Sequence, residues 1–515
     1  MSYNFCDEYG RPYILIKEQE TRRKVEENNV LEGNVRAFCE IADSLRTSLG
    51  PFGADKSIIS ADGEVTITND GATILKEMDV RGTPMGRLVT QLSASQDDEI
   101  GDGTTSVVII AAALLKEALK LKEKGMHPLK IIRGYEEALE IALKVVEKSS
   151  HSVSEEEMEE AIAKVAKSTL SSKIVSRDME NYIKIAAESV EAVTDRRGEA
   201  NLELIKIEGE ISVEKSELIR GVYISKELSH FQMEKQIEHA KIALLACPLE
   251  PPKVKAKHDL NIEGVEEYKK LVEYEKKVFS EMVEQIKNVG ANVVLCQWGF
   301  DDEANSLLLQ NGISAIRWVG AQELEMTAIH CGAQIISRFE DLKESALGTA
   351  RVTEHRGSTR IEHVRSSGQN GAEIGGEAER EDREEKRGKA VTILVRGGTH
   401  AMIEEIKRSV RDVLCSIRNI RREKRIVRGA GRVDLECAQA VFEQMPGSIG
   451  RAYGRALQEL PMALASNEGE DPIARLSEEI AEEVWEGAHS KKHQYIVATQ
   501  TVKAIVRIDD VFEGK

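Results

Sequence analysis

The sequence predicts a multi-domain α/β protein, in which a mostly helical domain built from both ends of the chain has other domains inserted in it. Three observations predict this fold class. The chain has 515 residues, enough for about three domains. Its two ends are rich in helix-forming residues with apolar side chains at helical spacing. Its middle alternates between strand-like and helix-like segments.

The composition argues against several classes of protein. Acidic residues outnumber basic ones, 89 against 71, and this balance argues against a general nucleic-acid binder. The seven cysteines form no CxxC pair, which argues against a zinc site or a disulfide framework. The longest apolar run, residues 107–115, is too short to cross a membrane, and residues 1–12 lack the apolar core of a signal peptide. We therefore expect a cytoplasmic protein that binds neither nucleic acid nor membrane.

Residues 30–150 are expected to be helical, with glycine-rich corners between the helices. Residues 31–50 carry apolar side chains at helical spacing and end at Gly50-Pro51, a strong signal for a helix C-terminus. The next stretch, SIISADGEVTITNDGATIL at 57–75, predicts two short strands around an Asp62-Gly63 turn.

The middle of the chain predicts a small parallel sheet covered by helices. A helix is expected at 155–167 and a strand at 201–209. Farther along, strand-like and helix-like segments alternate at 241–249, 265–290, 291–299, 301–310 and 313–320. This order is typical of parallel strands joined by helices. Prolines and lysines at 248–261 indicate an exposed excursion after the first of these strands.

The last third of the chain begins with a charged insertion. Residues 366–388 are rich in glycine and charge and have almost no bulky apolar side chains, so we expect a mobile surface segment. Residues 389–398, KAVTILVRGG, predict a buried strand. From Ala401 the chain is helical again, and residues 504–512, AIVRIDDVF, predict a final strand.

Three glycine-rich corners in the first helical region, each followed by a helical pattern, are candidates for binding phosphate. They read LGPFGADK at 49–56, NDGATIL at 69–75 and GDGTTSVV at 101–108. Glycine lets the backbone approach a phosphate closely, and a helix N-terminus offers free N–H groups with positive potential. Thr104 and Thr105 can cap the third helix or bind a phosphate oxygen.

The acids of these corners point to a cation. Asp102 would repel a bare phosphate, so it implies a metal, for which Mg²⁺ is the natural choice, and Asp70 is a second candidate carboxylate. The alternative is that each corner is a capping turn without a ligand, which is the commoner case for one corner alone. Because the chain has no GxxxxGK[ST] and no GxGxxG after a strand, a conventional P-loop or dinucleotide fold is disfavoured.

The pattern around Asp412 predicts a solvated side chain. One face of its helix is apolar and carries Ile403, Ile406, Val410, Val413, Leu414 and Ile417. Asp412 lies away from that face and can pair with Arg408 four residues earlier. By pattern alone, Lys173 is likewise an ordinary loop lysine.

These motifs together resemble the group II chaperonins. The shared signatures are TSLGPFGADK, TNDGATIL, GDGTTSVV, the VRGG strand and the terminal RIDD, in the order of the family and over nearly the whole chain. Longer stretches are similar to one subunit type of the eukaryotic cytosolic chaperonin CCT/TRiC; they lie at 7–19, 95–105, 246–258 and 296–311.

The resemblance implies the chaperonin fold and its function. The implied domains are an equatorial ATP-binding domain at 1–149 and 405–515, an intermediate hinge domain at 150–217 and 365–404, and an apical client-binding domain at 218–364 with a lid protrusion near 250–262. The implied assembly is a hetero-oligomeric double ring of eight-membered rings formed with sister subunits. ATP hydrolysis would close the lid over unfolded polypeptide clients such as actin and tubulin.

The resemblance also implies roles for individual residues. Those implied to bind ATP or ADP are Leu49, Gly50, Pro51, Gly71, Gly103, Thr104, Thr105, Ser172, Lys173, Gly429 and Gly431. Asp102 matches the Mg²⁺ ligand, and Asp70 matches an acid near the γ-phosphate, which Ser172 and Lys173 reach on closure. Asp412 matches the acid that positions the attacking water, and this reverses the solvated interpretation.

Two departures from the family pattern leave alternatives open. Residues 429–434 read GAGRVD where the family has GGGAxE. After Asp471-Pro472 the chain is shorter than the family pattern, in the part that normally holds the ribose and the base. The leading hypothesis is an ATP-hydrolysing chaperone subunit; the alternatives are a structural ring subunit with weak nucleotide binding or little hydrolysis, and a small-molecule phosphotransferase. The acids at 97–99 are not explained by phosphate binding, and we expect ring contacts or solvation for them.

Overall fold

The computed structural model describes residues 3–6, 12–15, 23–24, 30–60, 63, 65–195, 198–251, 264–363, 390–476, 484–509 and 512–513. The chain forms two compact units, Met1–Lys173 with Glu423–Lys515, and Ile174–Arg422. Both ends of the chain therefore contribute to one unit. The finer division into three domains stays a prediction. The expected insertion at 366–388, and all but the first residues of the expected protrusion near 250–262, lie outside the described residues.

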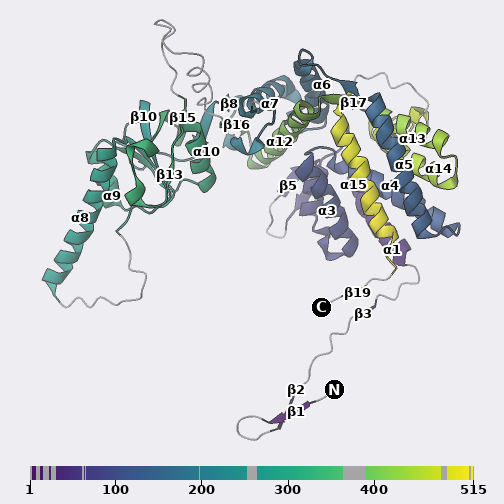
Figure 1. Ribbon diagram of the computed structural model, residues 1–515, viewed down its shortest axis with the longest axis horizontal. Helices are drawn as coiled ribbons and strands as arrows, with labels where there is room; N and C mark the ends of the chain where they lie inside the picture. The colour runs from purple at the N-terminus through teal and green to yellow at the C-terminus, as the bar shows by residue number, and fades with distance from the viewer. Residues whose placement is uncertain are drawn as a thin grey trace. The chain divides into compact units, whose positions relative to one another are not determined.

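The first unit is mostly helical. Its α-helices are α1 (Val30–Arg46), α2 (Gly71–Glu77), α3 (Pro84–Glu99), α4 (Thr104–Glu123), α5 (Pro128–Ser149), α6 (Met158–Ser171), α13 (Arg432–Gln444), α14 (Ser448–Glu468) and α15 (Ala488–Val506). Its strands are β1 (Tyr3–Cys6), β2 (Pro12–Leu15), β3 (Arg23–Lys24), β4 (Lys56–Ile59), β5 (Val65–Thr68), β6 (His151–Ser152), β17 (Arg425–Arg428), β18 (Trp485–Gly487) and β19 (Phe512–Glu513). The helices α4, α5, α13, α14 and α15 pack side by side (Figure 1).

Helix α4 lies at the centre of this unit. It contacts α1, α3, α14 and α15, and all nine residues of the apolar run at 107–115 are buried. A helix that is apolar on every side must be surrounded by protein, because no face of it can be left to water. The start of α4 is the GDGTT corner, so the best-packed helix of the unit holds that corner in place.

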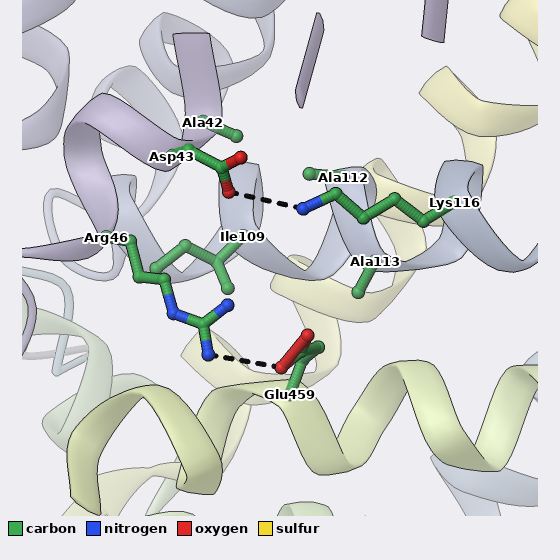
Figure 2. A pocket seen from close by; sticks show the side chains of 8 residues that line it. All are labelled: Ala42, Asp43, Arg46, Ile109, Ala112, Ala113, Lys116 and Glu459. Atoms are coloured by element: carbon green, nitrogen blue, oxygen red, sulfur yellow. Dashed lines mark hydrogen bonds and ion pairs between the residues drawn. The ribbon is translucent and has the colours of Figure 1, made fainter. Parts of the chain in front are cut away.

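Two ion pairs attach α1 to its neighbours, as Figure 2 shows. Asp43 pairs with Lys116 of α4 at 3.2 Å, and Arg46 pairs with Glu459 of α14 at 3.3 Å. The hollow between them is only about 10 Å³, room for about one water molecule. It is therefore a packing feature, and its importance is that Arg46 fixes the end of α1 just before the first glycine corner.

The second unit contains two sheets with covering helices. Its strands are β7 (Ile205–Ile211), β8 (Glu217–Ile219), β9 (Gly221–Ile224), β10 (Gln236–Leu245), β11 (Val293–Cys296), β12 (Ser314–Ile316), β13 (Ile335–Ile336), β14 (Gly348–His355), β15 (Ser358–Glu362) and β16 (Val391–Gly397). Its α-helices are α7 (Met179–Val193), α8 (Val265–Val289), α9 (Asp302–Gln310), α10 (Ala321–Cys331) and α12 (His400–Glu423).

The larger sheet confirms the predicted parallel arrangement. Its strand order is β12-β11-β10-β14-β15-β9, with β13 also paired to β10. The neighbours β10, β11 and β12 run parallel, whereas β14, β15 and β9 join antiparallel. The buried strand expected at 389–398 is β16, which pairs with β7 and β8 in a separate sheet.

Other expectations from the sequence have mixed outcomes. The hairpin is confirmed, since β4 and β5 pair antiparallel. The strand expected at 504–512 is wrong in its first part, because α15 continues to Val506; a short apolar run does not distinguish a buried helix end from a strand. In the described part of the chain no helix is long and apolar enough to span a membrane. The free thiols include Cys39, Cys247, Cys296, Cys331, Cys415 and Cys437.

His330 of α10 makes the stability of the second unit depend on pH. Its side chain is buried, and this burial, together with the neighbouring His363, lowers the pKa of His330 to about 4. Between the unfolded pKa of about 6.5 and the folded value, the unfolded chain takes up a proton that the folded chain does not. The free energy of unfolding should therefore fall as the pH drops from 6.5 toward 4, at up to about 1.4 kcal/mol per pH unit.

The variant His330→Asn provides the test. We expect the difference in melting temperature between wild type and variant to change steadily between pH 6.5 and 4, and to stay constant above pH 7. A difference that is the same at every pH would contradict this assignment.

Candidate functional site

The corner at residues 101–105 turns at two positions that require glycine, Gly101 and Gly103. Gly101 and Gly103 have φ of 75° and 78°, in the left-handed region that favours glycine. A Cβ on Gly103 would also lie 2.1 Å from Nε2 of Gln494 on α15. The corner therefore lies directly against α15, and α4 begins at Thr104 immediately after it.

The carboxylate of Asp102 accepts a hydrogen bond from the described backbone through only one of its two oxygens. Its Oδ1 accepts a hydrogen bond from Gly103 N at 2.7 Å, and its carbonyl oxygen accepts one from Gln96 Nε2 at 2.6 Å. Its Oδ2 accepts no hydrogen bond from the described residues. A carboxylate fixed through one oxygen, with the other unused, is suited to binding a cation.

Asp70 connects the second corner to the third. Its Oδ2 accepts hydrogen bonds from N and Oγ1 of Thr73, both at 2.9 Å, and so caps α2. Its Oδ1 accepts a hydrogen bond from Oγ1 of Thr104, the first residue of α4, at 2.8 Å. One carboxylate thus joins the N-termini of two helices.

The two helix N-termini also lie in direct contact. A Cβ on Gly71 would lie 2.7 Å from Oγ1 and 2.9 Å from N of Thr105. Gly71, Thr104 and Thr105 are all buried. The absence of a side chain at Gly71 therefore allows α2 to lie against the first turn of α4, where free N–H groups create a binding site for an anion.

Ser172 and Lys173 lie beside these corners. Nδ2 of Asn69 donates a hydrogen bond to the carbonyl oxygen of Ser172, at the end of α6. The positive charge of Lys173 lowers the pKa of both Asp70 and Asp102. Asp70 and Asp102 therefore lie close enough to Lys173 for its charge to act on both.

The two acids have opposite pKa shifts. Burial alone would raise the pKa of Asp70, but Lys173 and the hydrogen bonds from Thr73 and Thr104 hold it below its ordinary value. Burial raises the pKa of Asp102 to about 6, and Glu486 contributes to the rise. Asp102 is thus a carboxylate with too little positive charge nearby, and a bound cation would supply it.

The donor set restricts what kind of metal site is possible. No group of three or more His, Cys, Asp or Glu side chains in the described part of the chain could hold a metal ion. Mg²⁺ commonly binds through one or two carboxylates, with substrate phosphates and water completing its shell. Asp102 fits that pattern, and it does not fit an all-protein metal cage.

The first corner differs from its expectation. It follows the end of α1 and leads into β4, so the predicted helix after it is wrong. Nδ2 of Asn467 on α14 donates hydrogen bonds to the carbonyl oxygens of Arg46 and Leu49, at 2.9 and 2.8 Å. Gly50 has φ of 82°, and a Cβ there would lie 2.6 Å from Leu464. Residues 49–51 are therefore a rigid turn fixed by α14, without the N–H groups of a helix start.

The glycine loop at 429–431 turns from β17 into α13. Gly431 has φ of 83° and Ala430 has φ of 53°, so the alanine also adopts the left-handed conformation. A Cβ on Gly429 would lie 2.6 Å from Oε1 of Glu486, on the paired strand β18. The loop therefore contacts the same Glu486 that raises the pKa of Asp102.

Sequence reasoning missed a buried charge cluster next to this loop, made of Asp434, Glu486, Lys491 and Tyr495. Nζ of Lys491 lies 3.0 Å from Asp434 and 3.2 Å from Glu486, and Tyr495 donates a hydrogen bond to Asp434 at 2.6 Å. Burial alone would lower the pKa of Lys491, but the two carboxylates raise it above its ordinary value. The spacing of Ala488, Lys491 and Tyr495 along one face of α15 was the available signal.

The acids at 97–99 are partly explained by α15. Glu99 lies 2.8 Å from Nε2 of His493, whose Nδ1 lies 2.7 Å from Oε1 of Gln96. Gln96 in turn holds the backbone of Asp102. Glu99 therefore has a partner within the chain while its side chain stays 65% exposed, and the expectation of ring contacts or solvation stays a prediction.

Asp412 belongs to the second unit, on α12. The pattern-based interpretation of a solvated residue is wrong, since Asp412 is buried, and Arg408 pairs with Glu405 at 2.7 Å. The predicted apolar face of the helix is buried as expected. Its role toward the corners of the first unit stays a prediction. After Pro472, where the sequence predicts a shortened ribose and base side, residues 477–483 lie outside the described part of the chain.

Comparison with known proteins identifies the relatives of this chain. Residues 41–479 match the TCP-1/cpn60 chaperonin family. The chain is 43% identical to T-complex protein 1 subunit epsilon of Encephalitozoon cuniculi, covering 99% of both chains. It is 35% identical to thermosome subunit beta of Aeropyrum pernix, covering 98% of this chain and 94% of that one. Thermosome subunit alpha of the same organism is also 35% identical, over 91% of this chain and 83% of that one. The narrower resemblance to one CCT/TRiC subunit type, the epsilon type, is thereby confirmed.

The Lys491 cluster gives a prediction for stability. Replacing Lys491 by Met leaves two carboxylates without their cation, one of them fully buried, and should lower the free energy of unfolding by about 3–5 kcal/mol. Adding Asp434→Asn should recover part of that loss, because it removes the unpaired buried charge. Urea unfolding measures the free energy of unfolding of the single and the double variant. Hydrogen exchange in α13 and α15 shows whether the change lies at the cluster.

The neighbouring Lys492 provides the matched control. It is only half-buried, so Lys492→Met should change stability by less than about 0.5 kcal/mol. Equal effects of the Lys491 and Lys492 variants would contradict the cluster.

Proposed function

Because the chain belongs to the TCP-1/cpn60 chaperonin family, we propose that it is a chaperone subunit that binds and hydrolyses ATP. The observation that carries this proposal is the pairing of the α2 and α4 N-termini by Asp70, next to the free oxygen of Asp102. Two glycine corners and a carboxylate in one place are suited to a phosphate chain that carries a divalent cation.

In this proposal the phosphates of ATP bind at Gly71, Gly103, Thr104 and Thr105. The backbone N–H groups of the first turn of α4 would face the phosphate oxygens, and Asp102 would hold Mg²⁺. When bound, the ion neutralises charge that develops on the phosphates during transfer. Leu49, Gly50 and Pro51 complete the phosphate side, and Gly429 and Gly431 lie on the nucleoside side.

Hydrolysis is proposed to require further side chains and a closing movement of the subunit. Asp412 would position the attacking water, Asp70 would act near the γ-phosphate, and Ser172 and Lys173 would approach it when the subunit closes. Phosphoryl transfer depends mainly on positioning and charge neutralisation, so an acid that is supplied only on closure can couple hydrolysis to a change of shape. That change would close a lid over an unfolded polypeptide.

The proposed setting is a cytosolic hetero-oligomer. Sister subunits would form a double ring of eight-membered rings, and actin and tubulin are the proposed class of clients. The names of the relatives, each a subunit of a larger assembly, support this setting.

A second candidate is a structural ring subunit with weak nucleotide binding or little hydrolysis. The sequence after Pro472, which we expect to be shorter than the family pattern, favours it, and the alignment with the epsilon relative spans 544 positions against 515 residues in this chain. Substitutions at the two key acids distinguish the candidates.

Asp412→Asn should leave ATP affinity nearly unchanged and lower the hydrolysis rate by about a hundredfold or more, because it removes only the group that orients water. Asp102→Asn should weaken Mg²⁺-dependent ATP binding by about tenfold or more, while binding without Mg²⁺ changes little. Calorimetric titration measures the affinity for ATP with and without Mg²⁺, and phosphate release measures the hydrolysis rate.

Asp98→Asn is the matched control, since Asp98 is an exposed acid four residues before Asp102. It should behave like the wild type in both assays. Wild-type protein that fails to bind ATP, or that binds it with little hydrolysis, would favour the structural ring subunit. Hydrolysis that is unchanged in the Asp412→Asn protein would contradict the role of Asp412.

A further inference from the structure

A pocket in the second unit lies where three neighbouring parallel strands end. Its volume is about 470 Å³, within the range of ligand pockets. The residues that line it follow directly after the carboxyl ends of β10, β11 and β12: Pro248, Glu250, Trp298, Gly299, Phe300, Asp301, Arg317 and Trp318. Open α/β sheets bind their ligands outside the carboxyl ends of the strands, because the loops diverge there.

Two tryptophans form the walls of this pocket although both are largely exposed. Trp298 is 50% exposed and Trp318 is 58% exposed. Indole rings are costly to leave in water, and exposed aromatic side chains around a hollow are typical of a binding surface. Contacts with the backbone of Ala246 and with Gly299 fix the two rings.

Trp298 is anchored through its ring nitrogen, which donates a hydrogen bond to the carbonyl oxygen of Ala246 at 2.8 Å. Trp318 has φ of 61°, a strained conformation for a bulky residue, and such strain often occurs at functional sites. Its ring lies over Gly299, where a Cβ would be 2.4 Å from Cζ2. The missing side chain of Gly299 therefore determines where the Trp318 ring lies.

The charges around the pocket favour a cation. Among the described residues that line the pocket, Glu250 and Asp301 are acidic and Arg317 is basic, so the acids outnumber the base. Asp301 is exposed, and its carboxylate accepts no hydrogen bond from the described residues. Aromatic faces attract cations through their quadrupole, and nearby carboxylates add to that attraction.

We propose that this pocket binds a lysine or arginine side chain presented by an apolar stretch of an unfolded polypeptide. The indole rings of Trp298 and Trp318 contact the alkyl part and the charged head, and Glu250 and Asp301 face the cation. The inference rests on the proposed function as a chaperone, since it names the kind of segment that one pocket of the subunit selects. Phosphate-bearing ligands are disfavoured by the same two acids.

Intrinsic fluorescence provides the assay. The chain has three tryptophans, so in the full-length Trp485→Phe protein only Trp298 and Trp318 contribute. The probe is a nonapeptide with lysine between two leucines, compared with copies that carry glutamate or norleucine instead. We expect saturable quenching by the lysine peptide, with affinity about tenfold higher than that of the glutamate copy and with norleucine between them.

Substitutions in the pocket test the cause of that selectivity. Glu250→Gln with Asp301→Asn should reduce the preference for lysine to less than about threefold, and Arg317→Gln should increase it. Gly299→Ala displaces the Trp318 ring without changing any charge, and should weaken binding of both the lysine and the norleucine peptide. Asn is an effective helix N-cap, so Asp301→Asn is expected to leave α9 intact.

Two results would overturn the proposal: equal affinity for the lysine and glutamate peptides, or unchanged lysine binding in the Gly299→Ala protein. Circular dichroism confirms that each variant is folded. ATP hydrolysis is measured on the same preparations, so loss of peptide selectivity with intact hydrolysis refutes the pocket alone, whereas absent hydrolysis with intact selectivity refutes only the proposed ATPase activity.

Discussion

The carboxylate of Asp70 bridges two helices, and the candidate site depends on this bridge. It caps α2 through Thr73 and accepts a hydrogen bond from Thr104, where α4 begins. Gly71 then lies against Thr105 with no side chain between them. Because α4 is buried in the centre of its unit, the bridge transfers the rigidity of that helix to the corner at 69–71. The N–H groups at the start of α4 and the free oxygen of Asp102 are thereby held beside Asn69 and Lys173.

The site holds more carboxylates than lysines. Lys491 is shared between Asp434 and Glu486, and Lys173 acts on both Asp70 and Asp102. Asp70 is stabilised as an anion by its hydrogen bonds, whereas burial raises the pKa of Asp102 to about 6. The protein thus leaves the half-buried carboxylate of Asp102 short of positive charge, at the place where phosphates and a divalent cation are proposed to bind. The proposed hydrolysis additionally involves Asp412, a residue of the second unit.

The sequence predicted the features that depend on local spacing. The β4–β5 hairpin, the parallel strands β10, β11 and β12, and the glycine corner before α4 follow from turn residues and periodicity. The burial of Asp412 and Lys491 could not be predicted in this way, because each depends on neighbours that are distant in sequence. The end of α15 was predicted as a strand for a related reason, since three apolar residues fit either structure. Likewise, the partner of Glu99 is His493, almost 400 residues farther along the chain.

The most direct test of the central claim is the affinity for Mg²⁺-ATP of the Gly71→Ala protein. Alanine favours the helix α2 locally, but its Cβ would lie 2.7 Å from Oγ1 of Thr105 and force the two N-termini apart. Gly82→Ala is the control, since a Cβ there has no atom within 4 Å. The account predicts that Gly71→Ala lowers the affinity by about tenfold or more with the fold retained, while Gly82→Ala changes it little. Unchanged affinity in a folded Gly71→Ala protein would contradict it.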